Sequence, residues 1–301
     1  MILALPYPQI APEIFSLTLG PLTLALRWYA LAYIAGFLIG LWILKRSLAR
    51  PGLWPGAVAP MTREQADALL TWIVLGVVLG GRLGYVLFYQ PAYFLAYPDE
   101  IVKVWQGGMA FHGGLAGVII AAALFCLRHR LPALSVADAL ALATPPGLFL
   151  GRLANFINGE LWGRPSDVPW AMAFPDPAAQ VCPLDWVGAC TRHPSQLYEA
   201  GLEGLVLGAV LLWLAFGRRA LCHPGRICGA LLLGYALARS FVELFRQPDA
   251  QFQSLTNPQG YGLILGDWGL TMGQILSVPL AVAGLILLVL SWRRAGRRAG
   301  Q

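Results

Sequence analysis

Four short stretches concentrate the side chains of this sequence that could do chemistry. They read GGMAFHGG, GRLANFINGELWGRP, RHPSQLYE and ARSFVELFRQPD, at residues 107–114, 151–165, 192–199 and 238–249. In the last stretch Arg239, Glu243 and Arg246 are spaced i, i+4, i+7, so on a helix one carboxylate can pair with two guanidinium groups. Guanidinium forks also suit the geometry of a phosphate. The spacing therefore indicates either a structural ion pair or part of an anion site.

The first two stretches add a candidate base and further hydrogen-bonding groups. His112 is the candidate base, because imidazole exchanges protons near neutral pH, although a histidine among glycines can equally be a packed structural residue. Arg152, Asn155 and Glu160 come directly after a long apolar run, where polar side chains are costly unless they are paired or functional. His193, beside Pro194, is interpreted as structural.

The rest of the chain is apolar enough to predict a membrane protein. Of its 301 residues 57% are hydrophobic and 12% are charged, and the mean hydropathy is +0.63. Soluble domains are rarely so apolar. Apolar runs long enough to cross a bilayer lie near 22–44, 68–89, 110–127, 134–154, 197–217, 226–246 and 271–292. We therefore expect an all-α polytopic membrane protein with about seven transmembrane helices, a single integral membrane domain over residues 1–301.

Basic residues predict the orientation of these helices. The segments KRSLAR, RHR, RRALCHPGR and RRAGRR follow the first, third, fifth and seventh runs, so alternating spans bring all four to one side. By the positive-inside rule that side is the cytoplasm, with the N-terminus outside and the C-terminus inside. The basic residues behind the net charge of +6 are therefore explained by membrane topology, and they do not indicate nucleic acid as a partner.

This topology brings polar side chains from six of the runs to the outer face. Tyr29 begins the first run, and Arg82 lies toward the outer end of the second. Arg82, Arg152 and Arg246 have few acids to match them, which favours an anion site over purely structural ion pairs. The anion most available at that interface is the phosphate of a phospholipid.

Several features concern packing and the outer loop. Small residues at helical spacing, which suit close helix packing, are Gly36/Gly40, Gly80/Gly84, Gly113/Gly117 and Gly147/Gly151. Pro145 and Pro146 should kink the fourth run. Residues 155–196 predict a small ordered head outside the membrane, in which a disulfide between Cys182 and Cys190 is a further hypothesis. The N-terminal stretch MILALPYPQIAPEIF predicts no cleaved signal peptide.

Familiar hydrolytic and metal motifs are absent from the sequence. It contains no HExxH, no GxSxG and no paired Asp motif, so we expect no metal ion and no cofactor. Two rival functions remain at this point. A transporter or flippase for anionic phospholipids would share an arginine-lined cavity, but it usually carries inverted repeats and broken helices near the midplane. An intramembrane protease would need a nucleophile with a base or a pair of aspartates.

The four polar stretches resemble, in the same order, those of the bacterial prolipoprotein diacylglyceryl transferases. GRLANFINGELWGRP is similar to that family's signature, and the likeness extends from about Tyr29 to Arg246 and on through the last apolar run. Ala154 departs from the pattern, which usually has glycine there, but it removes no functional group. Four long motifs in register make the resemblance specific.

The resemblance implies a reaction and a location. Such an enzyme takes the diacylglyceryl group of phosphatidylglycerol and joins it by a thioether to the lipobox cysteine of a prolipoprotein signal peptide, and glycerol phosphate leaves. It is a seven-span protein of the bacterial inner membrane, and its active site faces the periplasm. The partners are then phosphatidylglycerol, signal peptides with a lipobox cysteine, and the membrane lipids.

On this reading the polar residues take particular roles. Arg152 and Arg239 bind the phosphate and stabilise the leaving group, with Arg246 and Glu243 as a supporting pair. His112 is the candidate base for the thiol, which completes a catalytic set of His112, Arg152 and Arg239. The residues expected to bind phosphatidylglycerol are Arg152, Tyr29, Asn155, Glu160, Glu243 and Arg246.

Overall fold

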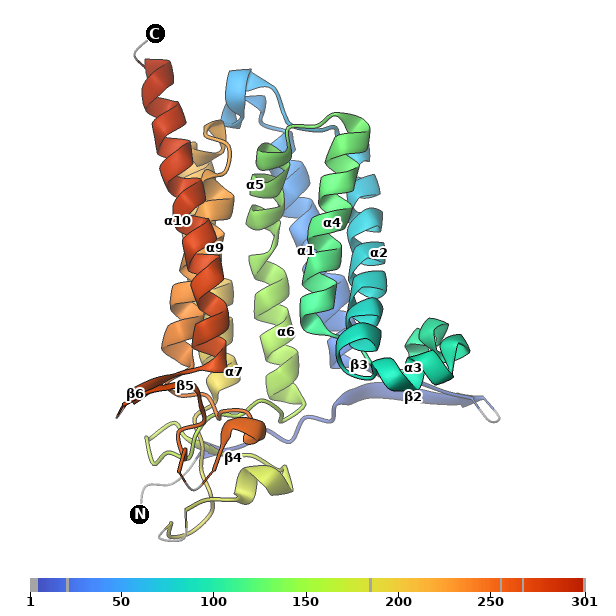
Figure 1. Cartoon of the computed structure of the whole chain (residues 1–301), viewed down its shortest axis with the longest axis vertical. Coiled ribbons are helices and arrows are strands. Elements are labelled where there is room, and N and C mark those ends of the chain that lie inside the picture. Colours follow the sequence, from blue (N-terminus) through green and yellow to red (C-terminus); the bar gives the residue numbers. More distant parts are fainter. Residues whose placement is uncertain (1–4, 20–21, 184–185, 255, 267, 300–301) are drawn as a thin grey trace.

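The computed structural model describes residues 5–19, 22–183, 186–254, 256–266 and 268–299. Long helices stand side by side, and the short strands gather at one end of the bundle together with irregular segments (Figure 1). We call this the head end. Two predictions concern residues outside the described ranges. One is the absence of a cleaved signal peptide, which involves residues 1–4, and the other is the expected head, which includes residues 184–185.

The helices follow the predicted apolar runs closely. Their bounds are α1 Trp28–Leu48, α2 Arg63–Phe88, α3 Pro91–Ala96, α4 Phe111–His129, α5 Ala133–Ala143, α6 Pro145–Ile157, α7 Ser195–Glu199, α8 Leu207–Leu212, α9 Arg226–Val242 and α10 Met272–Ala299. Within the described ranges, six helical segments are long and apolar enough to cross a membrane, by length and composition. They are α1, α2, α4, the α5–α6 pair, the segment Ser195–Gly217 and α10. The predicted sixth run corresponds to α9, which has 17 residues.

Two of these helical segments are irregular. The fourth is broken at Thr144, where α5 ends and α6 begins on Pro145, as the two prolines predict. A proline at the first helical position needs no hydrogen-bond partner for its nitrogen, so the chain restarts there without loss. The fifth contains π-helical turns at Ala200–Val206 and Trp213–Gly217, which the sequence does not predict.

Three two-stranded sheets correct the all-α expectation. Parallel β1 (Leu5–Pro6) and β4 (Met172–Ala173) join the N-terminal segment to the head, and β5 (Tyr261–Leu265) pairs with β6 (Trp268–Thr271). Antiparallel β2 (Glu13–Leu19) pairs with β3 (Leu22–Arg27). The first helix therefore begins at Trp28 and not at residue 22, because leucine alternates with other residues over 22–27, the period of a strand.

Glycines let pairs of helices approach closely. A Cβ added to Gly40 would lie 2.7 Å from the carbonyl oxygen of Ala143, and one added to Gly80 would collide with the carbonyl of Gly113. Contacts of this kind join α1 to both α5 and α6 and join α2 to α4, which confirms the predicted packing role at these positions. The prediction is wrong for Gly151, where an added Cβ would meet nothing within 4 Å.

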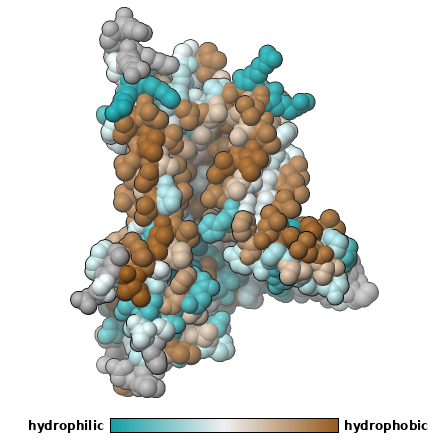
Figure 2. Space-filling model, in the orientation of Figure 1, coloured by the Kyte–Doolittle hydropathy of each residue, from teal (hydrophilic) through white to brown (hydrophobic). Residues whose placement is uncertain are grey.

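The two ends of the bundle differ in their polar residues. The connections after α1 and α4 and the end of α10 lie together at the end opposite the head (Figure 1). Lys45, Arg46, Arg128 and His129 occupy the last turns of α1 and α4 at that end. Figure 2 shows a mostly apolar surface over the helices between the two ends. This is the arrangement of a membrane protein whose basic connections share one side.

Candidate active site

Six charged side chains meet where α6, α7 and α9 reach the head end. They are Arg152, Glu199, Glu203, Arg239, Glu243 and Arg246, and we call them the charged cluster. Glu199, the last residue of α7, lies at the centre and contacts all three arginines. Its Oε2 lies 3.0 Å from Nε of Arg152, and its Oε1 accepts a short hydrogen bond from Arg239 and lies 3.8 Å from Nε of Arg246.

Glu243 and Glu203 complete the cluster on either side of Glu199. Oε2 of Glu243 lies 2.9 Å from Nη2 of Arg239, and Oε1 lies 3.9 Å from Nη1 of Arg246. The predicted pairing of Glu243 with both arginines is thus confirmed, although α9 ends at Val242 and Arg246 lies on the turn that follows. Glu203, in the first π-helical turn, lies 3.8 Å from Nη2 of Arg152.

Burial separates the acids of the cluster from its arginines. The side chains of Glu199 and Glu203 have no exposed area and that of Glu243 has 4%, whereas those of Arg152, Arg239 and Arg246 are 21%, 12% and 15% exposed. The carboxylates thus form the inner side, and the guanidinium groups border the accessible side. Every arginine retains surface that a ligand could reach.

The expectation that arginines outnumber acids here is wrong. Three carboxylates match three guanidinium groups, and two of these acids, Glu199 and Glu203, are not among the predicted site residues. Both lie inside the apolar run 197–217, and an acid within such a run is itself a functional signal. Charge balance also explains how three arginines tolerate one another in an apolar setting, because each has at least one carboxylate within ion-pair distance.

Hydrogen bonding within the cluster is incomplete. Among the described residues, neither carboxylate oxygen of Glu203 has a hydrogen-bond partner, and neither does Nε of Arg246. Their ion-pair contacts are 3.8 Å long, beyond the range of a hydrogen bond. Buried polar atoms are normally paired, so the cluster has bonding capacity left for another polar molecule.

A second polar group lies beside Arg152. The Tyr29 hydroxyl donates a short hydrogen bond to Glu160 and accepts another from Asn155, and Nδ2 of Asn155 lies 2.8 Å from Oε1 of Glu160. Asn155 follows Arg152 by three residues on α6, so this group lies about one helical turn from the charged cluster. Nε2 of Gln196 donates to the backbone carbonyl of Glu160 at 2.6 Å, so α7 supports both groups. The structure thus brings together three of the six residues expected to bind phosphatidylglycerol, Tyr29, Asn155 and Glu160.

The chain after α6 holds the turn that carries Arg246. Gly163 forms an antiparallel bridge with Arg246, and the amide of Arg164 donates to the carbonyl of Phe245 at 2.8 Å. A Cβ on Gly163 would lie 2.5 Å from that same carbonyl oxygen. The start of α10 packs against Glu243. A Cβ on Gly273 would lie 2.5 Å from Oε2 of Glu243, so a larger residue there would displace this carboxylate.

Arg82 is not part of this site, which corrects the expectation that it adds to the arginine excess. Its Nε donates to the carbonyl of Ile101 at 2.8 Å, and its two terminal nitrogens donate to those of Gly107 and Glu100 at 2.6 Å each. The guanidinium group also lies 5.1 Å from the ring of Phe94. Arg82 therefore fastens the segment between α2 and α4.

The two histidines near the head end differ in surroundings. His112, in the first turn of α4, is exposed, and its ring lies 5.5 Å from that of Phe111. No hydrogen bond joins it to another described residue, so its role as a base stays a prediction. Nδ1 of His193 lies 3.0 Å from the Tyr198 hydroxyl, and burial lowers the pKa of His193. The His193 ring also contacts Phe245, beside Arg246.

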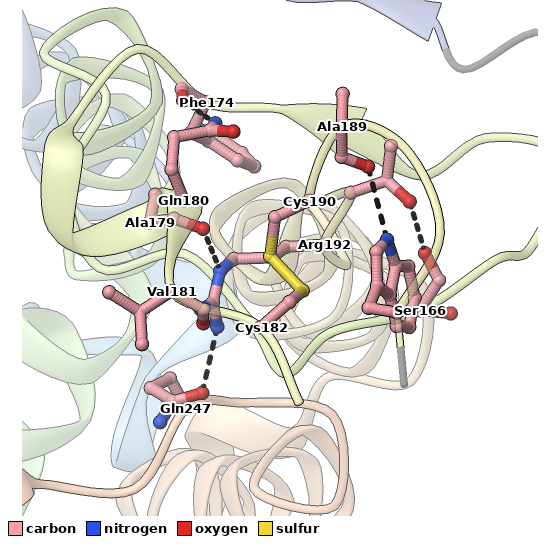
Figure 3. The surroundings of a disulfide bond; sticks show 12 residues. Ser166, Phe174, Ala179, Gln180, Val181, Cys182, Ala189, Cys190, Arg192 and Gln247 are labelled. Carbon is pink, nitrogen blue, oxygen red and sulfur yellow. Dashed lines mark hydrogen bonds between the residues drawn. A yellow bond between two sulfur atoms is a disulfide. The ribbon is translucent and has the colours of Figure 1, made fainter. Parts of the chain in front are cut away.

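The head contains the hypothesised disulfide. Cys182 and Cys190 are bonded, which confirms that hypothesis, and Arg192 lies beside them (Figure 3). The guanidinium group of Arg192 donates to the carbonyls of Ala179 and Val181 at 2.6 and 2.5 Å and to Gln247 at 2.9 Å. Arg192 thus ties the disulfide loop to the chain that follows Arg246.

Comparison with known proteins gives one consistent family. Residues 13–290 match the family model described as prolipoprotein diacylglyceryl transferase. A Ruegeria pomeroyi protein is 60% identical over 93% of this chain and 95% of its own length. Proteins of Roseobacter denitrificans and Rhizobium leguminosarum bv. trifolii are 56% and 50% identical, over 94% and 97% of this chain and 96% and 95% of theirs. All three are named phosphatidylglycerol–prolipoprotein diacylglyceryl transferase.

Proposed function

The chain belongs to the prolipoprotein diacylglyceryl transferase family, and we propose that it transfers the diacylglyceryl group of phosphatidylglycerol to the lipobox cysteine of a prolipoprotein. The observation that carries this proposal is the charged cluster, in which three partly exposed arginines surround one buried carboxylate at the end of an apolar bundle. The partly exposed guanidinium groups are hydrogen-bond donors that suit a lipid phosphate. The same site recognises the donor and stabilises the leaving group.

The reaction exchanges one bond at a glycerol carbon of the lipid. The cysteine sulfur forms a bond to that carbon while the bond from carbon to the phosphate oxygen breaks, and glycerol phosphate leaves with one additional negative charge. The thiol proton passes to a base and ends on the phosphate or in solvent. Because a free thiol has a pKa of about 8.5, the thiolate must be generated at the site.

Arg152 and Arg239 act on the leaving phosphate. Negative charge grows on the phosphate oxygens as the bond breaks, so preplaced guanidinium groups stabilise the transition state more than the bound lipid. Arg239 is held between Glu199 and Glu243, which restricts where its fork can point. Arg152 is the most exposed arginine of the cluster, and while its Nε pairs with Glu199 at 3.0 Å, its Nη2 lies 3.8 Å from Glu203 and can turn toward a phosphate. Arg246 and Glu243 support the pair.

The group beside Arg152 contacts the head group or orients the arginine. Glu160 and Asn155 present oxygen and nitrogen atoms close to the Tyr29 hydroxyl, and a glycerol head group has hydroxyls that can donate to or accept from such atoms. Tyr29 comes from α1, Asn155 from α6 and Glu160 from the segment after it, so the group joins the first helix to the cluster.

His112 is the proposed base for the thiol. An exposed imidazole at the head end is open to a peptide that approaches from the membrane, and imidazole is the side chain that exchanges protons near neutral pH. The thioether forms at the substrate cysteine, so no cysteine of this chain takes part.

The proposed location is the bacterial inner membrane, with seven spans, the N-terminus and head outside and the C-terminus in the cytoplasm. The shared end of the basic connections supports this orientation through the positive-inside rule. Crossing by α9 makes the number of spans odd, which places the two termini on opposite sides. The charged cluster then faces the periplasmic leaflet.

One assay tests the proposal directly. The purified protein is mixed with phosphatidylglycerol and a lipobox peptide, and mass spectrometry follows the peptide while released glycerol phosphate is quantified. We expect the peptide to gain one diacylglyceryl group on sulfur with an equal amount of glycerol phosphate released. Lipid transfer between leaflets with no thioether product would refute the proposal and favour a transporter.

A further inference from the structure

An apolar groove begins where the charged cluster ends. It has a volume of about 430 Å³ and lies between α1, α6 and the helical segment 204–212. Ile39 and Ile43 line it from α1, Phe149 and Leu150 from α6, and Leu205 and Ala209 from the third segment. The volume is that of an ordinary ligand pocket, and the lining is almost entirely apolar.

The groove is continuous with the charged cluster along two of its walls. Phe149 precedes Arg152 by three residues on α6, so the two side chains lie on one face about one turn apart. Gly204, another lining residue, directly follows Glu203. On α6 the lining continues to Pro145. Pro145 is seven residues, or roughly 10 Å, from Arg152 in the direction away from the head end. A molecule in the groove therefore extends from the cluster toward the middle of the membrane.

Backbone features shape the floor of this groove. A Cβ on Gly204 would lie 2.6 Å from Cβ of Phe149, and one on Gly208 would lie 3.0 Å from Cβ of Pro145. The two glycines let the helical segment touch α6 at the floor, while the exposed side chains of Ile39 and Leu205 stand on opposite walls. The groove thus forms because two glycines, Gly204 and Gly208, face the first half of α6, which begins at Pro145.

We propose that this groove binds one acyl chain of the phospholipid whose phosphate lies at the charged cluster. This inference rests on the proposed function and specifies how the donor lipid is held. A phospholipid at the head end has its acyl chains directed toward the bilayer midplane, which is the direction of the groove. A signal peptide helix is about 10–12 Å across with its side chains, too wide for a groove of this volume between packed helices.

The groove acts by positioning the lipid and not by hydrophobic burial. Surrounding lipid tails are as apolar as the groove, so moving one chain between them changes little hydrophobic free energy. A fixed chain instead fixes the glycerol carbon in line with the attacking sulfur, and a displacement of about 1 Å at the reacting atoms can cost about a hundredfold in rate. Filling the groove should therefore lower turnover only for lipids whose chains reach the filled position.

Ala209→Trp fills the groove, and Val210→Trp is its matched control. Ala209 is exposed and lines the groove, whereas its exposed neighbour Val210 is not among the lining residues. Ala209 is six residues beyond Glu203, about 9 Å along the helix from the charged cluster, so a palmitoyl chain passes this position and an acetyl group ends before it. The assay measures kcat/KM for dipalmitoyl and diacetyl phosphatidylglycerol in detergent with a lipobox peptide.

For Ala209→Trp we expect a loss of about tenfold in kcat/KM with the dipalmitoyl lipid. For the diacetyl lipid with Ala209→Trp, and for both lipids with Val210→Trp, kcat/KM should stay within about twofold of the wild-type value. Ile39→Trp, from the opposite wall, should repeat the result and serves where Ala209→Trp does not accumulate.

Equal loss on both lipids, or no loss on either, would overturn the groove proposal. A rise in KM for the peptide with unchanged lipid kinetics would also overturn it, because it would place the signal peptide in the groove. Failure of the wild-type protein to form any thioether would instead refute the proposed function, so the two failures are distinguishable.

Discussion

Two kinds of arginine lie at the head end, and their partners differ. Arg82 and Arg192 are buried and donate chiefly to backbone carbonyls, at distances of 2.5 to 2.8 Å for the strongest contacts. The arginines of the charged cluster are partly exposed and contact carboxylates, with some ion pairs at 2.9 and 3.0 Å and others at 3.8 or 3.9 Å. Both kinds look alike in the sequence, as single arginines near the ends of apolar runs.

The difference separates arginines that hold the fold from arginines that can exchange partners. A guanidinium group with its donors already bonded to carbonyls would have to lose those bonds to bind an anion. A guanidinium group paired with carboxylates at an accessible site can exchange one of them for a phosphate, which offers the same bidentate geometry. The predictions for Arg239, Glu199 and Arg82 test this division, and those for His112 and His193 test two further groups at the head end. They are given from the largest expected effect on turnover to the smallest.

Arg239→Lys should lose about a thousandfold in kcat/KM while the protein still inserts and folds. An ammonium group keeps the charge but cannot reproduce the fork that meets Glu199, Glu243 and the leaving phosphate together. The measurement is thioether formation per folded enzyme, with membrane insertion checked by fractionation. Turnover equal to that of the wild-type protein would remove Arg239 from the phosphate site.

His112→Gln should lower turnover by about a hundredfold and change the pH dependence of the rate, because it removes the proposed base. The readout is the pH–rate profile of kcat/KM, from about pH 5 to 9, across the range in which an imidazole titrates. If the profile keeps its shape, the cluster itself or the substrate supplies the base.

Glu199→Gln should lower kcat/KM by about tenfold through loss of positioning. The amide keeps the shape of the side chain, but it leaves three guanidinium groups without the carboxylate they share, so they should separate. Glu64→Gln is the matched control, since Glu64 lies in the first turn of α2 at the opposite end of the bundle. A change in kcat/KM equal to that of the control would show that the shared carboxylate is dispensable.

Arg82→Lys should leave turnover per folded enzyme within about twofold but lower the stability of the protein. The substitution loses hydrogen bonds from a buried guanidinium group, each with a net contribution of about 1 kcal/mol or more. The thermal unfolding midpoint and kcat/KM are measured on the same preparation. A large loss of turnover with unchanged stability would place Arg82 in the catalytic machinery and break the division drawn above.

The protonation of His193 should affect stability alone. Burial lowers its pKa below the value of about 6.5 expected in the unfolded chain. The contribution of the neutral ring is therefore complete above that value and is lost as the pH falls through the lower folded pKa. The thermal midpoint of the wild-type protein should drop more than that of His193→Gln between pH 7 and pH 5. Equal drops in the thermal midpoints of the two proteins would show that protonation of His193 does not change the stability of the fold.

Much of the site can be predicted from the sequence because charge is rare in this chain. Arg152 and Arg239 are conspicuous within or beside apolar runs, and the i, i+4 spacing of Arg239 and Glu243 already implies their pairing. The kink at Pro145 follows from the chemistry of proline. Glu199 also lies within an apolar run, but its three partners cannot be predicted locally, because they come from segments distant in the chain.

The amino-acid sequence by itself determines the apolar helices, their relative orientation and the family, since hydrophobic period, span length and the placement of basic residues are local properties of the chain. Only the tertiary structure decides which arginine serves the site and which serves the fold. That choice depends on whether a guanidinium group meets a carboxylate or a backbone carbonyl, and this is a matter of which segments pack together. The same packing places the apolar groove beside the charged cluster.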